Sequence, residues 1–437
     1  MRRVRSSTGR VVLGAVVVIA VVALVAVGLL TRSSDHGGSS GAPKQQPPPR
    51  STGACREPGA GPGGPPGGQA PQANVTVSAA SEIDTRGLVP IGIAAGDGEA
   101  WSVVRDPTHS TETPEAIVAR VDPSAGAFTT VTPVATGCYA SALTVGGGGV
   151  WVGTCDELAP AEATAGGQVV RVDPATGQVT RRVPLPTRCV GQLAVGKDAV
   201  AVSEPATAGR SQRVWRIDPG NGNVNQIDSL GGDASVGGVA VTDGGVWTQE
   251  VTPGADRARR VNPSSGQVED TVNENGASLV GGHGNAVWFE RAQPPSIAQR
   301  DATSGDVRTE SPVANVHSAV VGASGAWIQQ ATRDSLTITI GRVDPATGAV
   351  GPTFSFQGVG PDRSGLPFLG MLAADENGVW LIYQGRLFRF TAAGLTTESA
   401  PTTTTPPPTS EPSTTTTAPP TTAPATTSPA TTATSSP

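Results

Sequence analysis

The chain has 437 residues and a formal net charge of −6, with 30 basic and 36 acidic residues. An acidic excess repels nucleic-acid phosphates and anionic lipid headgroups, so we expect no nucleic-acid partner. No segment after residue 30 shows the apolar periodicity of an amphipathic helix, and the sequence therefore predicts an all-β protein.

The N-terminus has the pattern of a membrane anchor. Residues 1–10 carry four arginines and no acid, and residues 11–30 are an unbroken run of apolar and small residues. Twenty helical residues reach about 30 Å, the thickness of a bilayer core. The run exceeds the apolar core of a typical signal peptide, so we expect a single-pass anchor with residues 1–10 in the cytoplasm and the rest outside the cell. A cleaved signal peptide is the alternative.

Two segments have too little apolar content to offset the entropy of ordering. Residues 31–73 are rich in Gly, Pro, Ser and Gln and are interpreted as a linker. Residues 400–437 are nearly all Thr, Pro, Ser and Ala and are interpreted as a disordered tail. The folded domain is therefore expected at 74–399.

Within 74–399, a Gly/Asp/Asn-rich turn followed by a tryptophan recurs at steps of 39 to 53 residues. Ala201 stands in place of the tryptophan in one of the seven copies. The other six copies supply Trp101, Trp151, Trp247, Trp288, Trp327 and Trp380. Seven repeats of this length predict a seven-bladed β-propeller with four-stranded antiparallel blades. We expect each indole to fill the wedge between neighbouring blades.

Each repeat also contains an Arg-Val-Asp-Pro-Ala-Thr-Gly sequence or a variant of it, as at 171–177 and 342–348. Asp accepts a backbone N–H, Pro fixes φ, and Gly takes a left-handed conformation, which together predict a hairpin. A repeat is then an inner strand, the tryptophan strand, a strand ending at the hairpin and an outer strand. For closure of the ring, we favour an N-terminal strand at 74–77 over a C-terminal strand at 395–399.

This pattern resembles the seven-bladed propellers of the YVTN family and of streptogramin B lyases over the whole of 74–399. Their blades carry a similar G-x-x-W strand and a hairpin similar to that at 171–177. The resemblance implies the propeller fold. For the lyases it implies a histidine and a magnesium site on one face, although only Trp288-Phe289-Glu290 is similar to their W-F-T-E strand.

The strand order puts the glycine turns and hairpins on one face and the connections of variable length on the other, where binding sites tend to be. Asp156, Glu204, Glu250 and Glu290 lie at or just past the end of the tryptophan strand in four consecutive repeats. We expect them to form an arc that binds a cationic ligand or a hard cation such as Mg²⁺ or Ca²⁺. Four solvated loop acids are the alternative.

Two histidines belong to the same face. His109 lies in the first variable connection and is a candidate ligand-binding residue. His317 begins the sixth inner strand and is the candidate general acid or base, beside Glu290 or Glu250.

The cysteines point to an oxidising compartment. Cys138, Cys155 and Cys189 all fall on the variable face. We expect one disulfide among them, either Cys138–Cys155 or Cys155–Cys189, with Cys55 pairing with the third or staying free.

The motifs of serine hydrolases, zinc proteases and nucleotide-binding loops do not occur in the sequence. We therefore expect a membrane-anchored extracellular propeller that binds a protein, a glycan or a small molecule as a binding or scaffolding module. The alternative is an enzyme similar to streptogramin B lyases that opens cyclic depsipeptides with a histidine base and Mg²⁺. A third possibility is a surface-coat role for the tail at 400–437.

Overall fold

The computed structural model describes residues 80–108, 115–156, 165–205, 212–230, 234–252, 255–331, 337–357 and 370–391. These residues form strands and turns, with no helix among them. Thr397–Pro437 is a separate unit that lies outside this part of the chain.

No described residue belongs to a helix that could cross a bilayer. The expected anchor at 11–30, the linker at 31–73 and the tail at 400–437 all lie outside the described residues, so these three assignments stay predictions.

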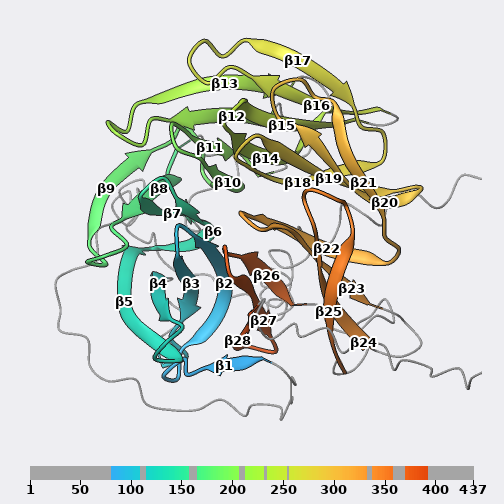
Figure 1. The fold of residues 1–437 in the computed structure, drawn as a ribbon. Helices are drawn as coiled ribbons and strands as arrows, with labels where there is room; N and C mark the ends of the chain where they lie inside the picture. Colours follow the sequence, from blue (N-terminus) through green and yellow to red (C-terminus); the bar gives the residue numbers. More distant parts are fainter. Residues whose placement is uncertain are drawn as a thin grey trace, which may run out of the picture. The chain divides into compact units, whose positions relative to one another are not determined.

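The strands form seven four-stranded antiparallel sheets, which confirms the seven-bladed propeller (Figure 1). In six sheets the four strands follow one another in chain order. Blades 1 to 3 consist of β2 Val89–Gly96, β3 Glu99–Arg105, β4 Glu115–Asp122 and β5 Ala127–Thr136; β6 Cys138–Gly146, β7 Gly149–Asp156, β8 Gln168–Val172 and β9 Val179–Pro184; and β10 Gln192–Val195, β11 Val200–Ser203, β12 Gln212–Ile217 and β13 Val224–Leu230. Blades 4 to 6 consist of β14 Ser235–Thr242, β15 Gly245–Thr252, β16 Ala255–Val261 and β17 Val268–Asn273; β18 Ala277–His283, β19 Ala286–Ala292, β20 Pro295–Asp301 and β21 Val307–Pro312; and β22 Val316–Gly322, β23 Gly325–Ala331, β24 Thr337–Val343 and β25 Val350–Gln357.

Blade 7 closes the ring from the N-terminal side. It combines β26 Met371–Ala374, β27 Gly378–Tyr383 and β28 Arg386–Thr391 with β1 Ser81–Ile83 as its outer strand. The backbone of Asp84 then bonds to blade 1, because its N–H donates to the Gly126 carbonyl (2.7 Å) and its carbonyl accepts from the Phe128 N–H (3.0 Å). The closing strand thus holds both blades. The strands expected at 74–77 and 395–399 fall outside the described residues.

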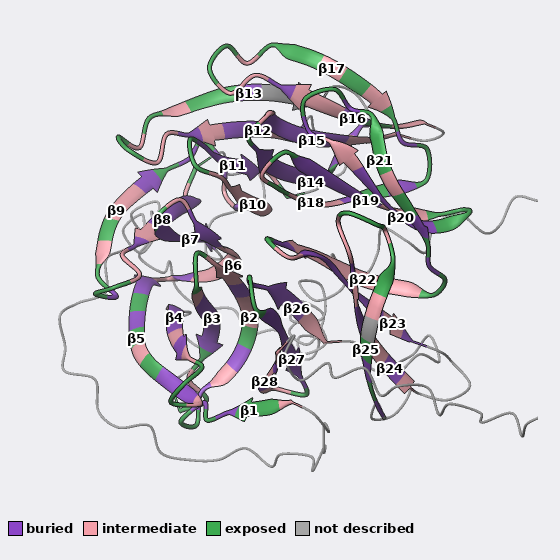
Figure 2. Cartoon of the chain, viewed as in Figure 1, coloured by how far each residue is buried: buried purple, intermediate pink, exposed green. Residues whose placement is uncertain are grey.

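The wedge predicted for the tryptophans is confirmed. All six occupy the second strand of their blade and are at most 2% exposed. Each packs against the following blade, as Trp247 of blade 4 does against Leu279 and Phe289 of blade 5. The rings of Trp247 and Phe289 meet edge to face, with centroids 6.5 Å apart. The second strands are accordingly buried, whereas the outer strands β17 and β21 are largely exposed (Figure 2).

The junction between blades 3 and 4 is the one where alanine replaces tryptophan. There Ala201 packs with Val214 and Ile227 of its own blade and with Val241 and Val246 of blade 4. Aliphatic side chains thus fill the wedge that an indole fills elsewhere.

The seventh tryptophan does not compensate for that alanine. Trp215, on β12, packs with Trp151 of blade 2, so two indoles share the junction between blades 2 and 3.

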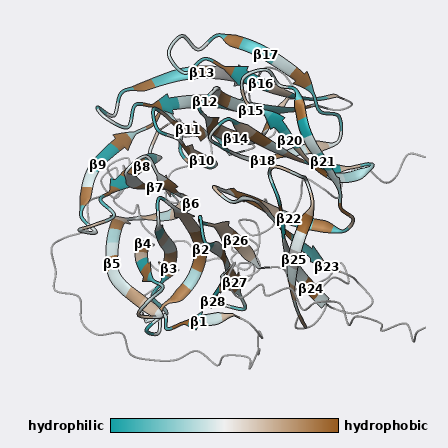
Figure 3. Ribbon diagram, in the orientation of Figure 1, coloured by the Kyte–Doolittle hydropathy of each residue, from teal (hydrophilic) through white to brown (hydrophobic). Residues whose placement is uncertain are grey.

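The inner strands that converge on the axis carry mostly small and apolar residues. The inner strand β26, for example, is hydrophobic, whereas the outer strand β17 mixes hydrophobic and hydrophilic residues (Figure 3).

The arginine of the hairpin sequence has a packing role. It lies directly opposite the tryptophan of its blade, as Arg171 does to Trp151 and Arg389 to Trp380. The guanidinium carbons lie 5.4 Å and 4.9 Å from the respective ring centroids, within the range of a cation–π contact. Polar ends of long side chains thus cover the outer edges of the buried indoles.

The hairpins have the predicted turn chemistry. In blade 2, Asp173 Oδ1 accepts the N–H groups of Thr176 (2.8 Å) and Ala175 (3.1 Å), and Gly177 has φ +70°. The Thr176 N–H is the main cause of the lowered pKa of Asp173.

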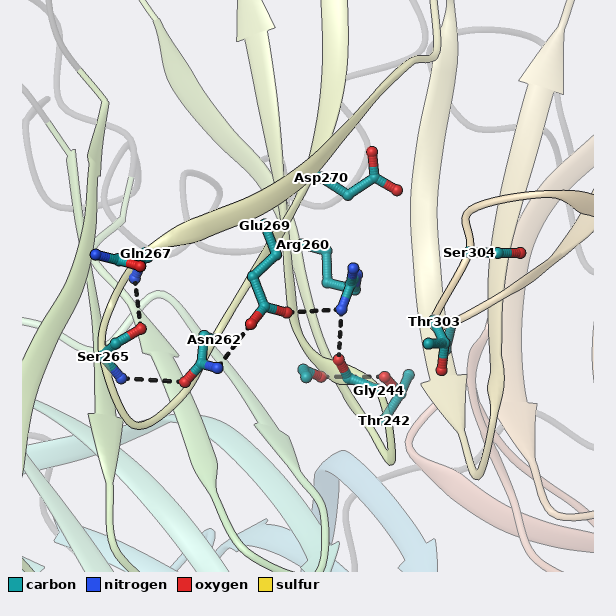
Figure 4. Close-up of polar contacts among 12 residues, drawn as sticks. Thr242, Gly244, Arg260, Asn262, Ser265, Gln267, Glu269, Asp270, Thr303 and Ser304 are labelled. Carbon is teal, nitrogen blue, oxygen red and sulfur yellow. Dashed lines mark hydrogen bonds and ion pairs between the residues drawn. The ribbon is translucent and has the colours of Figure 1, made fainter.

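Asn262 replaces Asp in the blade 4 hairpin and accepts from Ser265 N–H at 3.1 Å, while its own amide donates to Glu269 at 2.7 Å (Figure 4). The same Glu269 pairs with Arg260, the arginine opposite Trp247 (Figure 4). Glu269 thus connects the hairpin residue Asn262 with Arg260, the arginine that lies opposite the buried Trp247.

Glycines end several inner strands because the strands nearly touch there. A Cβ on Gly96 would lie 2.5 Å from the Val145 carbonyl oxygen of blade 2, and one on Gly146 would lie 2.8 Å from a Val195 methyl of blade 3. Real Cβ atoms do not approach other atoms so closely, so a side chain at these positions would push neighbouring blades apart.

We predict that Trp247→Ala lowers the free energy of unfolding by about 3–5 kcal/mol, because it removes the indole and leaves a cavity between blades 4 and 5. Urea titration of the full chain measures this value. The control is Val268→Ala on the outer strand, where the side chain is 47% exposed and the expected loss is below about 0.5 kcal/mol. Equal losses in the two variants would contradict the wedge.

Candidate functional site

The two faces of the ring differ in the lengths of their connections. On the hairpin face, defined by the turns between first and second strands and between third and fourth strands, the connections range from two residues (97–98) to six (173–178). On the variable face, defined by the connections from second to third strands and between blades, they range from two residues (253–254) to eleven (157–167) within a blade. The prediction that one face is uniform and the other variable is confirmed.

The four candidate acids of the variable face do not occupy equivalent positions. Asp156 is five residues after the tryptophan of its strand, whereas Glu290 is two residues after. Glu204 and Glu250 are each three residues after the tryptophan position. Because side chains alternate along a strand, Glu290 lies on the side of the tryptophan, toward the next blade, and the other three lie on the opposite side. The expected arc of equivalent carboxylates is therefore split over two sides of the blades.

Two of these acids are held by arginines of their own blade. Glu204 pairs with Arg213 on β12 at 2.6 Å, and the same guanidinium group donates to the Pro186 carbonyl at 2.7 Å. Glu250 pairs with Arg259 on β16 at 2.6 Å. Both carboxylates are mostly shielded from solvent, so a cationic ligand would have to displace an arginine to reach them.

Asp156 ends β7 and is buried. Its backbone N–H donates to the Arg188 carbonyl (3.2 Å), and its carbonyl accepts from the Arg188 guanidinium (3.0 Å). Residues 157–164, which follow it, lie outside the described residues, as does His109.

The disulfide beside Asp156 decides between the two expected pairings. Cys155 on β7 is bonded to Cys189, 34 residues further along, with the Cα atoms 4.1 Å apart. Cys138 is also disulfide-bonded, so the alternative pair Cys138–Cys155 was wrong. The bond joins blade 2 to the segment that leads into blade 3, on the variable face. Cys55 lies outside the described residues.

Glu290 has the most unusual environment among the candidates. Its strand β19 contacts the inner strand β22 of blade 6, and burial raises the pKa of its carboxyl to about 7. No ion pair or hydrogen bond of this carboxyl is found within the described part of the chain. On β22, the pairing register shifts at His317, and His317 Nε2 lies 3.3 Å from the Ala331 carbonyl oxygen.

Two glutamines that the sequence analysis did not select occupy the position of Glu290 in other blades. Gln249 accepts from the Leu279 N–H at 2.7 Å and donates to the Ala277 carbonyl of blade 5. Gln329, with its amide oriented to satisfy both contacts, donates to the Gly370 carbonyl (3.1 Å) and accepts from the Gly370 N–H (3.3 Å) at the start of blade 7. Each side chain therefore ties its blade to the backbone of the next one. The signal in the sequence is the residue two positions after the tryptophan.

A buried ionic cluster at the junction of blades 4 and 5 was also missed. Glu274, between β17 and β18, is 1% exposed and bonds to Arg291 (3.1 Å) and to Arg300. Arg291 also pairs with Glu310 on β21 at 2.8 Å. Glu274 lies in a connection outside the repeated frame, so nothing in the pattern distinguishes it from a solvated loop acid.

Arg300 is free to join this cluster because the hairpin sequence of blade 5 departs from the others. Gln299, in place of arginine, lies opposite Trp288, and Arg300 is one position further on. Since successive side chains point to opposite sides, Arg300 lies on the side away from the indole, toward Glu274.

No group of three or more His, Cys, Asp or Glu side chains among the described residues is arranged to hold a metal ion. The proposed Mg²⁺ or Ca²⁺ therefore has no assigned ligands in this part of the chain.

Comparison with known proteins finds only distant similarity. No family model matches the chain, and no curated protein matches it. Among solved structures, a chain in a crystal structure of the mitotic checkpoint complex is 12% identical, with 82% of this chain and 99% of that chain covered and a TM-score of 0.47. The β-propeller domain of Cps50 (Swd1) from Myceliophteria thermophila is 8% identical, with 69% and 96% covered and a TM-score of 0.45. The resemblance to YVTN propellers and streptogramin B lyases stays a prediction.

We predict that Glu274→Ala lowers the free energy of unfolding by about 3–5 kcal/mol, because it leaves Arg300 buried without a carboxylate and removes one of the two carboxylates that hold Arg291. Chemical denaturation measures the loss. Glu269→Ala is the matched control, since Glu269 also pairs with an arginine but its side chain is 34% exposed, and the expected loss is below about 1 kcal/mol. A loss for Glu274→Ala no larger than for the control would show that the cluster does not stabilise the junction.

Proposed function

We propose that this protein is a membrane-anchored extracellular propeller that binds a protein, glycan or small-molecule ligand on its variable face. The observation that carries the proposal is the contrast between the faces. Connections within a blade reach eleven residues on one face of the ring and at most six residues on the other face. Variable connections on a rigid scaffold are the usual location of recognition sites, because they change without disturbing the core.

The N-terminal part of the sequence supports the location. The apolar run at 11–30 and the arginines before it favour a single-pass anchor with the propeller outside the cell. A flexible linker of 43 residues (31–73) has a root-mean-square span of about 35 Å. A ring tethered in this way would reach ligands at a short distance from the membrane. An exported location also agrees with the disulfide between Cys155 and Cys189.

Site-specific photocrosslinking in the cells that produce the protein tests the binding face. A photoreactive residue replaces Arg105 or Arg257, which are exposed toward the variable face, or Ala175, which is exposed in a hairpin. We expect a discrete adduct from positions 105 and 257 and none from position 175. Adducts from position 175 alone would overturn the assignment of the face.

A catalytic role is the second candidate, and the environment of Glu290 favours it. A carboxyl group with a pKa of about 7 can donate or accept a proton at neutral pH, and His317 lies on the inner strand of the adjacent blade. If the protein opens cyclic depsipeptides, the full chain should do so with Mg²⁺, and His317→Ala or chelation should abolish the reaction. Intact antibiotic after incubation with the folded full chain would remove this candidate.

A further inference from the structure

The disulfide bonding of Cys138 leaves one partner for it within the chain. The four cysteines of the sequence are Cys55, Cys138, Cys155 and Cys189. Cys155 and Cys189 are bonded to each other, and Cys138 is also disulfide-bonded. The cysteine of this chain that remains is Cys55, which lies outside the described residues. The partner of Cys138 is therefore either Cys55 or a cysteine of another molecule.

The burial of Cys138 favours a partner from the same chain. Its side chain is 0% exposed and belongs to the apolar cluster between blades 1 and 2, with Val134 of blade 1 and Val152 of blade 2. A cysteine of a second molecule could reach this sulfur only by inserting into the junction. A segment of the same chain can be enclosed there while the blades assemble, because its effective concentration is on the order of millimolar.

The sequence between Cys55 and the ring is long enough for such a bond. Residues 56–80 separate Cys55 from β1, which begins at Ser81. A segment of about 25 residues reaches up to about 80 Å when it is extended. A domain of about 300 residues has a radius of gyration of only about 20 Å. The length of the segment therefore does not restrict which part of the ring Cys55 can meet.

The bond of Cys138 lies on the side of blade 2 away from the Cys155–Cys189 bond. Cys155 lies opposite Tyr139, the neighbour of Cys138 on β6. Because successive side chains point to opposite sides of a sheet, Cys138 points toward blade 1 and Cys155 toward blade 3. Both cysteines lie at the end of blade 2 that belongs to the variable face. The two bonds therefore occupy different junctions and do not compete.

We propose that Cys55 and Cys138 form a disulfide that attaches the N-terminal part of the chain to the variable face of blade 2. Residues 1–54 then join the ring through β6, and the closing strand β1 lies inside the covalent loop between the two cysteines. The tether shortens from 31–73 to 31–54, and its root-mean-square span falls from about 35 Å to about 27 Å. The tether thus ends at the variable face.

This attachment relieves the contacts that close the ring. β1 has three residues, and its Glu82 pairs with Arg386 through a carboxylate that is 43% exposed, so the ion pair contributes little. If the N-terminal segment joined the ring only through β1, a pull on the tether would act directly on these contacts. With the disulfide in place, the pull acts on Cys138 in β6, which pairs with β7 along its length.

Formation of the bond is a two-electron oxidation. The two thiols lose two protons and two electrons as the S–S bond forms. The disulfide of an exported thiol–disulfide oxidoreductase takes up these protons and electrons and is reduced to two thiols. The bond therefore rests on the exported location in the proposed function, and it requires no ligand. Without this bond, the variable face would keep its connections, so photocrosslinking there and the tests below can fail separately.

Peptide mapping of the exported full chain, alkylated without reduction, identifies the partner of Cys138. Trypsin and chymotrypsin together cut after Arg50, Arg56, Phe128 and Tyr139, and a cut after Tyr139 separates Cys138 from Cys155. We expect peptide 51–56 to be linked to peptide 129–139 and the linked pair to disappear on reduction. Alkylated Cys55, or either peptide linked to another molecule, would overturn the proposal.

Cleavage of the linker tests the route of attachment. The recognition sequence of a protease that cuts nowhere else in the chain is inserted after Gly68, between Cys55 and β1. After cleavage, we expect the two fragments to stay together on a non-reducing gel and to separate completely on reduction. Cys55→Ser should allow separation without reductant, whereas the matched control, Cys155→Ser combined with Cys189→Ser, should not. Separation without reductant when Cys55 and Cys138 are both present would contradict the attachment.

Discussion

Burial of a wedge of apolar side chains between consecutive blades is the constraint on which this structure depends. A single four-stranded sheet has two faces and cannot cover either of them alone, so each blade needs a neighbour on both sides. The indoles are the largest side chains in this contact, and each is covered by the next blade in the ring. The junction at Ala201 shows that the requirement is for filled volume: Val214, Ile227 and Val241 do there what an indole does elsewhere.

This constraint acts on the middle of the blades and leaves their ends free to differ. At the hairpin face, Asp or Asn side chains close turns that vary little, and inner strands approach so closely that glycine is required at Gly96 and Gly146. At the variable face the strands are further from these restraints, and the connections within a blade range from two to eleven residues. The asymmetry between uniform and variable ends is what gives the molecule one face suited to recognition.

Polar contacts between blades add to the apolar wedge, and they differ from one junction to the next. Blades 2 and 3 are joined by the Cys155–Cys189 disulfide, blades 4 and 5 by Gln249 and the Glu274 cluster, and blades 6 and 7 by Gln329. Glu290 is a carboxyl group in a position where glutamine serves elsewhere. A repeat protein can therefore place a titratable group at one junction while the apolar wedge keeps the ring intact.

The sequence by itself determined the propeller, the number of blades, the place of the tryptophans and the chemistry of the hairpins. These features recur with a period, and each depends on residues close together in the chain, as the turn at Asp173 does. Only the tertiary structure decided which cysteines pair, that β1 at Ser81–Ile83 closes the ring, and that Gln249 and Gln329 bond to the backbone of the following blade. The reason is that these outcomes depend on neighbours that are distant in the chain, and the spacing of the repeat does not contain them.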